Sequence, residues 1–121
     1  MKTYSFESLD VWQCSRRLSV FIYTATKVFP DDEKFGLVSQ MRRAAISVSS
    51  NLAEGSAKRT GKEKARFTET AYCSLMELLN QCIISNDLEF LNAQDLEKSR
   101  TMIDEIAAKA TRLRDTQLNL K

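Results

Sequence analysis

The chain has 121 residues, which suits one domain (1–121) that buries a core without metal ions or disulfide bonds. Its 43% hydrophobic and 28% charged residues are typical of a globular protein, and three glycines and one proline leave the long uninterrupted segments of an all-α fold. The sequence contains no histidine, so it lacks the commonest general base and the commonest transition-metal ligand. We therefore expect no metal, no cofactor and no enzymatic activity.

The cysteines and the hydropathy of the sequence indicate the cellular compartment in which we expect the protein. The three cysteines, Cys14, Cys73 and Cys82, match no metal-ligand spacing, and Cys14 and Cys82 fall on apolar helix seams as small core residues. Residues 1–10 lack the apolar run of a signal peptide, and no segment approaches the ~18 consecutive apolar residues of a membrane span. Free thiols without an export signal favour the reducing cytoplasm, and we expect no membrane partner.

Apolar spacing predicts four helices. They cover about residues 9–29, 33–54, 61–88 and 93–116. Pro30 follows the first helix, and Gly55 is expected to cap the second at its C-terminus. The patterns Thr60-Gly-Lys-Glu63 and Asn92-Ala-Gln-Asp95 are typical capping boxes for the third and fourth. Short connections between long helices predict an up-down antiparallel four-helix bundle.

The first helix also carries apolar residues away from its core face. Trp12 and Tyr23 lie about three turns apart on nearly the same side. They are either scattered surface residues, which are common, or part of a subunit interface, where aromatic side chains are enriched. We expect the second, and hence a homo-oligomer.

The second helix carries a polar stripe beside its apolar face. Its members recur at helical spacing: Gln40, Ala44, Ser47, Asn51 and Glu54. The third helix has a counterpart: Thr70, Ser74, Glu77 and Gln81. Both stripes either face water or form a polar seam, within the bundle or between subunits, that fixes the helix register. Glu54 and Glu77 alone do not make a catalytic pair, because no nucleophile or second base accompanies them.

Positive charge is concentrated between the second and third helices. Lys58, Arg59, Lys62, Lys64 and Arg66 fall within nine residues, with Glu63 as the only acid among them. The cluster straddles a helix start, where free N–H groups also favour anions such as phosphate. It is either a solvated loop or a nucleic-acid-binding hinge that contacts backbone phosphates without reading sequence.

Two further cations, Arg42 and Arg43, lie on the second helix about three turns before this hinge. We include them among the candidate nucleic-acid-binding residues. Whether they join the same patch depends on how subunits assemble.

A family resemblance rests on motifs spread from residue 6 to residue 115. They include Phe29-Pro30, Phe35-Gly36-Leu37, Gln40-Met41-Arg42-Arg43-Ala44-Ala45, Asn51-Leu52-Ala53-Glu54-Gly55 and Ser74-Leu75-Met76-Glu77. With them, the chain resembles the small four-helix-bundle proteins encoded in 23S ribosomal RNA intervening sequences of bacteria. It is also similar to the accessory proteins of diversity-generating retroelements, which are basic pentamers that bind nucleic acid and a reverse transcriptase.

The resemblance implies a homo-oligomer, a pentameric barrel of bundles, with no established enzymatic activity. Together with the basic hinge, it predicts a protein that binds nucleic acid, structured RNA in particular. The alternative is a protein–protein adaptor or scaffold, such as an accessory subunit to a reverse transcriptase, whose hinge is merely solvated.

Overall fold

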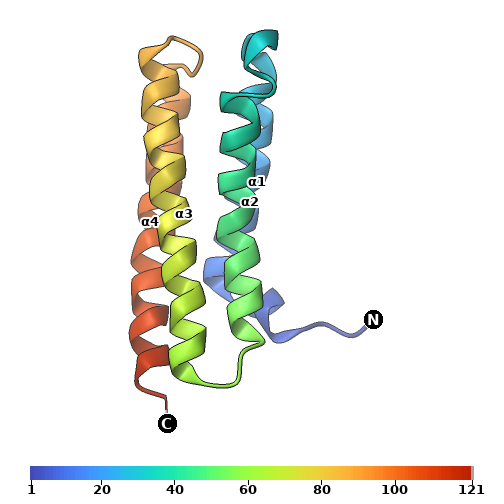
Figure 1. The fold of residues 1–121 in the computed structure, drawn as a ribbon, viewed down its shortest axis with the longest axis vertical. Coiled ribbons are helices and arrows are strands. Elements are labelled where there is room, and N and C mark those ends of the chain that lie inside the picture. The colour runs from blue at the N-terminus through green and yellow to red at the C-terminus, as the bar shows by residue number, and fades with distance from the viewer. Residues whose placement is uncertain (121) are drawn as a thin grey trace.

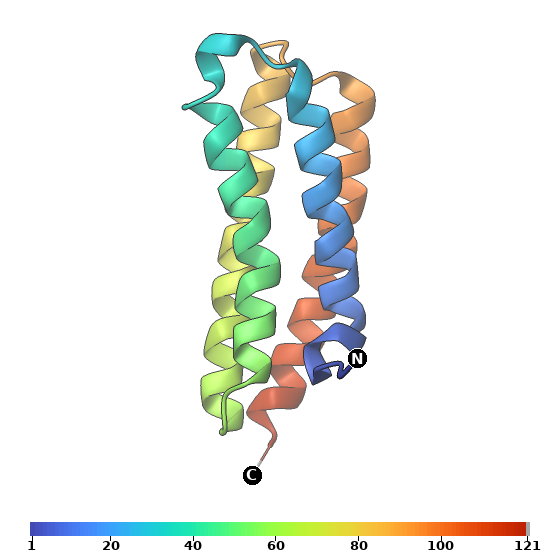
Figure 2. The ribbon, with the colours of Figure 1, turned by 90° about the vertical axis from the view of Figure 1, so that its right-hand side faces the viewer.

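The computed structural model describes residues 1–120, which contain four α-helices and no strand. The helices are α1 (Asp10–Ala25), α2 (Leu37–Ser56), α3 (Gly61–Asp87) and α4 (Ala93–Leu118). Short 3-10 helices precede and follow α1: η1 (Ser5–Ser8), η2 (Thr26–Val28) and η3 (Asp31–Glu33). Successive helices run antiparallel (Figure 1), and α1 with α2 forms one layer that packs on a second layer of α3 and α4 (Figure 2). The predicted all-α, four-helix fold is confirmed.

The core lies along the bundle axis, where the apolar faces of all four helices meet. Leu18, Met41, Leu75 and Ile103, one from each long helix, are fully buried there. Burying such a side chain contributes roughly 1.5–3 kcal/mol relative to leaving it exposed. Because each helix offers its stripe to the same axis, packing rather than intrinsic propensity stabilises the helices.

The two predicted capping residues begin their helices as expected. The Thr60 hydroxyl accepts a hydrogen bond from the Glu63 backbone N–H (3.1 Å), and the Asn92 side-chain oxygen accepts one from the Asp95 N–H (2.7 Å). Each bond satisfies a backbone donor that has no partner inside its helix, and each typically contributes about 1 kcal/mol.

The predicted ends of the first two helices need correction. α1 ends at Ala25 and tightens into η2, whereas the prediction carried it to residue 29. α2 begins at Leu37 rather than near residue 33, because Gly36 has φ −108° and ψ −112°, outside the helical region. The Glu33 carboxylate then accepts a hydrogen bond from the Leu37 N–H (3.2 Å). Apolar spacing does not detect such a local departure from helical geometry.

Gly55 is not the predicted C-terminal cap, since α2 continues to Ser56. It is instead a buried point of close approach between α2 and α3. A Cβ atom at Gly55 would lie 2.9 Å from the Phe67 Cβ and 3.3 Å from the Lys64 carbonyl oxygen. Only glycine therefore lets the two helices pack at this distance.

The helix α1 is held to both neighbours by polar contacts. The Ser19 hydroxyl donates to the Ala45 carbonyl of α2 (3.2 Å). Towards α4, Lys109 forms ion pairs with Asp10 and with Glu105, the latter at 2.7 Å. The hydrogen bond from Lys109 lowers the pKa of both carboxyl groups below their ordinary values.

We expect Gly55→Ala to lower the free energy of unfolding by roughly 1–3 kcal/mol, because the methyl group overpacks the α2–α3 contact. In an open helix the same substitution would stabilise the protein by about 0.5–1 kcal/mol, so the sign tests the contact. Urea denaturation measures it. Ser50→Ala, at an exposed position of α2, is the control and should stay within about 0.5 kcal/mol of wild type. A stabilised Gly55→Ala protein would contradict the close packing.

The Lys109 ion pairs predict a dependence of stability on acid. A carboxyl group whose pKa is lowered by folding stabilises the native state above its unfolded pKa, and this stabilisation disappears as the pH falls. We expect the wild-type free energy of unfolding to fall between about pH 5 and pH 2, and Lys109→Met to make that fall shallower. Urea titrations at several pH values measure it. Arg112→Met, at an exposed residue of α4, should keep the wild-type slope, and equal slopes in all three proteins would contradict the assignment.

Candidate nucleic-acid interface

The basic hinge turns the chain within residues 57–60 and continues into the first turns of α3. The side chains of Lys58, Arg59, Lys62 and Arg66 are exposed there. Within residues 1–120, none of these four cations forms an ion pair. They stand beside the first turn of α3, whose backbone N–H groups add partial positive charge. This end of the bundle therefore presents unneutralised cations to solvent.

Two lysines of the hinge also have intramolecular contacts. The Lys64 ammonium group donates a hydrogen bond to the Ser56 carbonyl oxygen at 2.9 Å, and it thereby caps the last turn of α2. Lys58 lies over the ring of Phe67, with 4.9 Å between its nitrogen and the ring centroid. Arg59, Lys62 and Arg66 are consequently the cations most available to an anion, while Lys64 holds the turn in shape.

Arg42 is occupied at the other end of α2. Its Nε donates to the Thr26 hydroxyl (3.0 Å), its Nη2 donates to the Tyr23 carbonyl oxygen (3.1 Å), and its guanidinium lies 4.5 Å from the Tyr23 ring centroid. Arg42 therefore satisfies backbone and side-chain oxygens at the C-terminal end of α1. Its neighbour Arg43 is exposed.

Neither of these arginines joins the hinge within one chain. Arg43 and Lys58 are separated by most of α2, and a rise of 1.5 Å per residue puts roughly 20 Å between them. The predicted set of seven cations thus divides into a hinge group and a pair near the start of α2, and the structure brings only the hinge group together.

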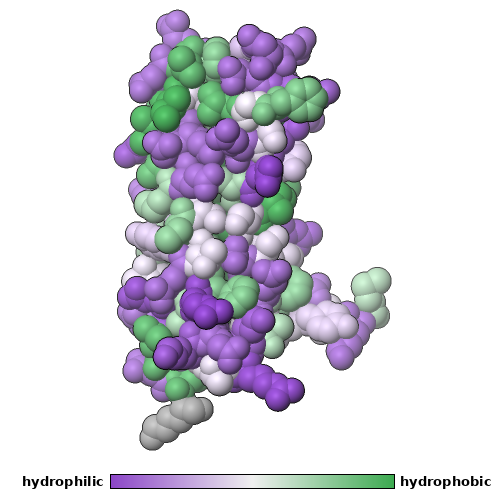
Figure 3. Space-filling model, viewed as in Figure 1, coloured by the Kyte–Doolittle hydropathy of each residue, from purple (hydrophilic) through white to green (hydrophobic). Residues whose placement is uncertain are grey.

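The polar stripes of α2 and α3 meet at their centre. The hydroxyl groups of Ser47 and Ser74 lie 2.9 Å apart, and the Asn51 side-chain amide donates to the Ser47 carbonyl oxygen (2.8 Å). Along the middle of this face, residues of near-neutral hydropathy gather where the two helices adjoin (Figure 3). Further along α3, the Gln81 amide donates to the Glu77 carboxylate at 3.2 Å. Of these bonds, only the Ser47–Ser74 contact crosses between the helices, and it fixes the register of α2 against α3.

The outer members of the α2 stripe, Gln40 and Glu54, are exposed. The structure therefore assigns the centre of the seam to contacts inside the bundle and leaves its two ends on the surface. The interpretation that the whole stripe faces water does not fit the Ser47–Ser74 contact.

Of the two aromatic residues predicted to lie away from the core, Tyr23 is on the exposed side of α1, whereas Trp12 packs against the edge of the core. Trp12 is half-buried, because Phe6 packs against it edge to face with 5.0 Å between ring centroids. Arg16 lies over the indole at 5.5 Å, and Tyr23 remains 40% exposed under Arg42. The aromatic pair is thus accompanied by two arginines, which spacing alone did not indicate.

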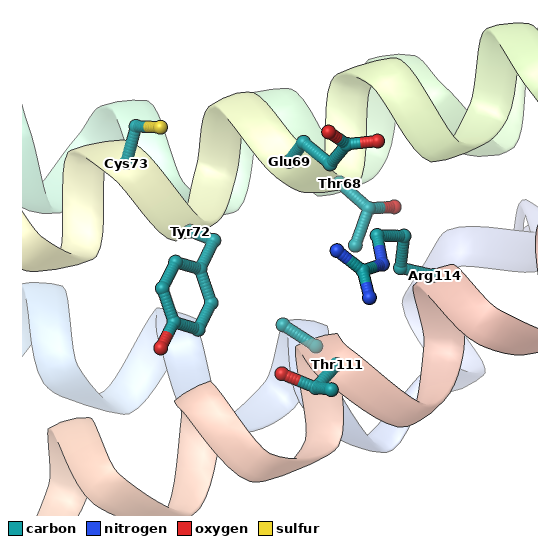
Figure 4. A pocket seen from close by; sticks show the side chains of 7 residues that line it. Thr68, Glu69, Tyr72, Cys73, Thr111 and Arg114 are labelled. Carbon is teal, nitrogen blue, oxygen red and sulfur yellow. The ribbon is translucent and has the colours of Figure 1, made fainter.

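A pocket between α3 and α4 was also not predicted. Its cavity measures about 350 Å³ and is lined by Thr68, Glu69, Tyr72, Cys73, Ala110, Thr111 and Arg114 (Figure 4). The Tyr72 ring reaches towards α4, and the Arg114 guanidinium reaches towards α3. The residue that could have indicated this pocket from the sequence is Tyr72, at the edge of the apolar face of α3. In the structure its side chain is 39% exposed.

The comparisons with known proteins decide the family. The profile described as 23S rRNA-intervening sequence protein matches residues 7–112. The chain belongs to this family. All of the candidate site residues fall within the span shared with the family, including the polar stripes, the basic hinge and the two aromatic residues of α1. A search of curated proteins gave no match. No helix within residues 1–120 has the length and apolar character needed to cross a bilayer.

The different environments of Arg42 and Arg43 predict different effects on stability. We expect Arg42→Ala to lower the free energy of unfolding by about 1–3 kcal/mol, because the Thr26 and Tyr23 oxygens lose a charged donor. Arg43→Ala should stay within about 0.5 kcal/mol of wild type. Thermal and urea denaturation of the two variants provide the comparison, and equal stabilities would refute the capping role of Arg42.

Proposed function

We propose that this protein is a non-catalytic, cytoplasmic bundle that self-associates and binds nucleic acid, structured RNA in particular, through its basic hinge. The observation that supports the proposal is the group of exposed, unpaired cations Arg59, Lys62 and Arg66 beside the start of α3. Lys58 adds a fourth exposed cation. The three free thiols, Cys14, Cys73 and Cys82, fit a reducing compartment.

Phosphate is the group that this surface suits. Arginine and lysine side chains neutralise backbone phosphates and release counterions, which gives affinity without sequence specificity. Phe67, the aromatic ring that Lys58 contacts, is half-buried and covered by that lysine. It therefore offers a base little exposed surface on which to stack.

Self-association would make this small patch effective. A few phosphate contacts per chain give weak binding, but a ring of copies repeats the hinge at regular intervals around one mouth of the assembly. The pentamer implied by the family resemblance is our proposed form. Structured RNA is the first ligand to test, since the family is named after intervening sequences of ribosomal RNA.

The triple variant Arg59→Glu/Lys62→Glu/Arg66→Glu should lose binding to a structured RNA hairpin. Three lost phosphate contacts should reduce the slope of log affinity against log salt by about 2–3. Fluorescence anisotropy with labelled RNA hairpin and labelled duplex DNA, each at several salt concentrations, measures both effects. The matched control reverses three exposed cations away from the hinge, Lys27→Glu/Lys98→Glu/Arg100→Glu, and should keep most of the affinity.

Two outcomes would contradict the proposal. One is equal affinity of the hinge variant and the wild-type protein, which would place binding elsewhere. The other is negligible binding of wild-type protein at low salt, which would favour the protein–protein adaptor.

A further inference from the structure

Charge is divided between the two layers of the bundle. No aspartate or glutamate occurs in residues 11–30 or in residues 34–53. These ranges include all of α1 after Asp10 and α2 as far as Ala53. Their charged residues are all basic: Arg16, Arg17, Lys27, Lys34, Arg42 and Arg43. The other layer, from residue 61 to residue 120, has ten acidic residues and eight basic ones, and beyond the hinge, from residue 67 onward, it has nine acidic residues and five basic ones. Away from the basic hinge and from the turn at residues 31–33, the two layers therefore differ in the sign of their net charge.

The outer surface of the α1–α2 layer combines these cations with apolar side chains. Val20 is 64% exposed, Tyr23 40% and Ile46 43%, and Arg16 covers the indole of Trp12. We call Trp12, Arg16, Val20, Tyr23 and Ile46 the cationic face. Figure 2 looks onto this layer. Exposed apolar residues accompanied by arginine are typical of protein interfaces.

The cationic face is not complementary to itself. A two-fold contact between two copies of this face would bring arginines against arginines, with no carboxylate on either α1 after Asp10 or on α2 before Glu54 to neutralise them. A partner for this face must offer carboxylates and room for apolar side chains.

The α3–α4 groove of the same chain offers both. Its pocket of about 350 Å³ has Tyr72 and Ala110 among its walls and Glu69 at its edge. Arg114 also lines the pocket, and its guanidinium is paired with Asp115. Asp104 is exposed and lies seven residues before Thr111, which puts both on one side of α4. We call Glu69, Tyr72, Asp104 and Thr111 the acidic groove. It belongs to the layer opposite the cationic face (Figure 1).

The two surfaces also match in height along the bundle. Asp10 pairs with Lys109, and the Cys14 thiol contacts Glu105 (3.6 Å). These contacts place Arg16, half a turn beyond Cys14, at about the level of Asp104. Two copies standing side by side in the same direction would thus set the Arg16 of one near the Asp104 of the next.

We propose that the cationic face of one copy docks on the acidic groove of a second, parallel copy. This inference rests on the self-association proposed above and adds the two surfaces that carry it. Because the surfaces differ, the contact is head-to-tail, and repetition closes a ring or extends a filament. In a parallel ring, the basic hinges of all copies would lie at the same open end of the ring.

Blocking one surface at a time tests the inference. Val20→Glu alters the cationic face and Thr111→Trp fills the acidic groove, and both positions are exposed. We expect each variant alone to have the 13.8 kDa mass of a monomer. Their equimolar mixture should have twice that mass and no more, because one intact surface remains on each chain. Light scattering behind a sizing column measures the mass, and circular dichroism confirms that both variants are folded.

A charge exchange gives a second measurement. Arg16→Glu and Asp104→Arg should each shift the assembly towards monomer, and the chain carrying both should recover the wild-type mass. A double variant that stays monomeric would contradict this contact.

Four results would overturn the inference. Wild-type mass in both single-surface variants, or a mixture that stays monomeric, would show that other surfaces join the copies. A wild-type assembly that falls to monomer after ribonuclease treatment would show that RNA, and not contact between the two surfaces, joins the copies. A monomeric wild-type protein would overturn the proposed self-association itself. The first three results would leave either the proposed self-association or the proposed role of the basic hinge unaffected.

Discussion

The close packing of α2 against α3 is the constraint on which the displayed cations depend. Gly55 removes the side chain that would separate the helices at Phe67, and the Ser47–Ser74 contact fixes their register further along. With the helices this close, four residues suffice to reverse the chain. The result is a short turn whose cations are exposed to solvent.

Much of the fold could be predicted, because its signals are local. Apolar spacing located four helices, and Thr60 and Asn92 begin two of them as capping residues should. The start of α2 could not be predicted, since it depends on the conformation of Gly36. The role of Gly55 was also misread. Its sequence position suits a cap, but its actual use depends on a helix that comes later in the chain.

The candidate site was predicted less completely, for the same physical reason. Arg42 and Arg43 are neighbours in sequence and equally cationic, yet a 100° step around the helix directs one to the end of α1 and the other to solvent. Only the packed structure separates a cation that satisfies carbonyl oxygens from one that is free for a ligand. The uneven distribution of charge is visible in the sequence, but it gains meaning only when α1 and α2 are known to lie in one layer and α3 and α4 in the other.

The contacts between α1 and α4 join distant parts of the chain. Cys14 meets Glu105 and Lys109, which are 91 and 95 positions away, whereas α2, α3 and α4 are linked in sequence by short turns. Closing a long loop is entropically more costly than closing a hairpin. Pairing α1 with α4 therefore costs more loop-closure entropy than pairing helices that are neighbours in sequence. A terminal helix whose contacts are this distant in sequence can make the same contacts with a neighbouring copy, so crowded copies of this chain have a route to domain swapping through α1.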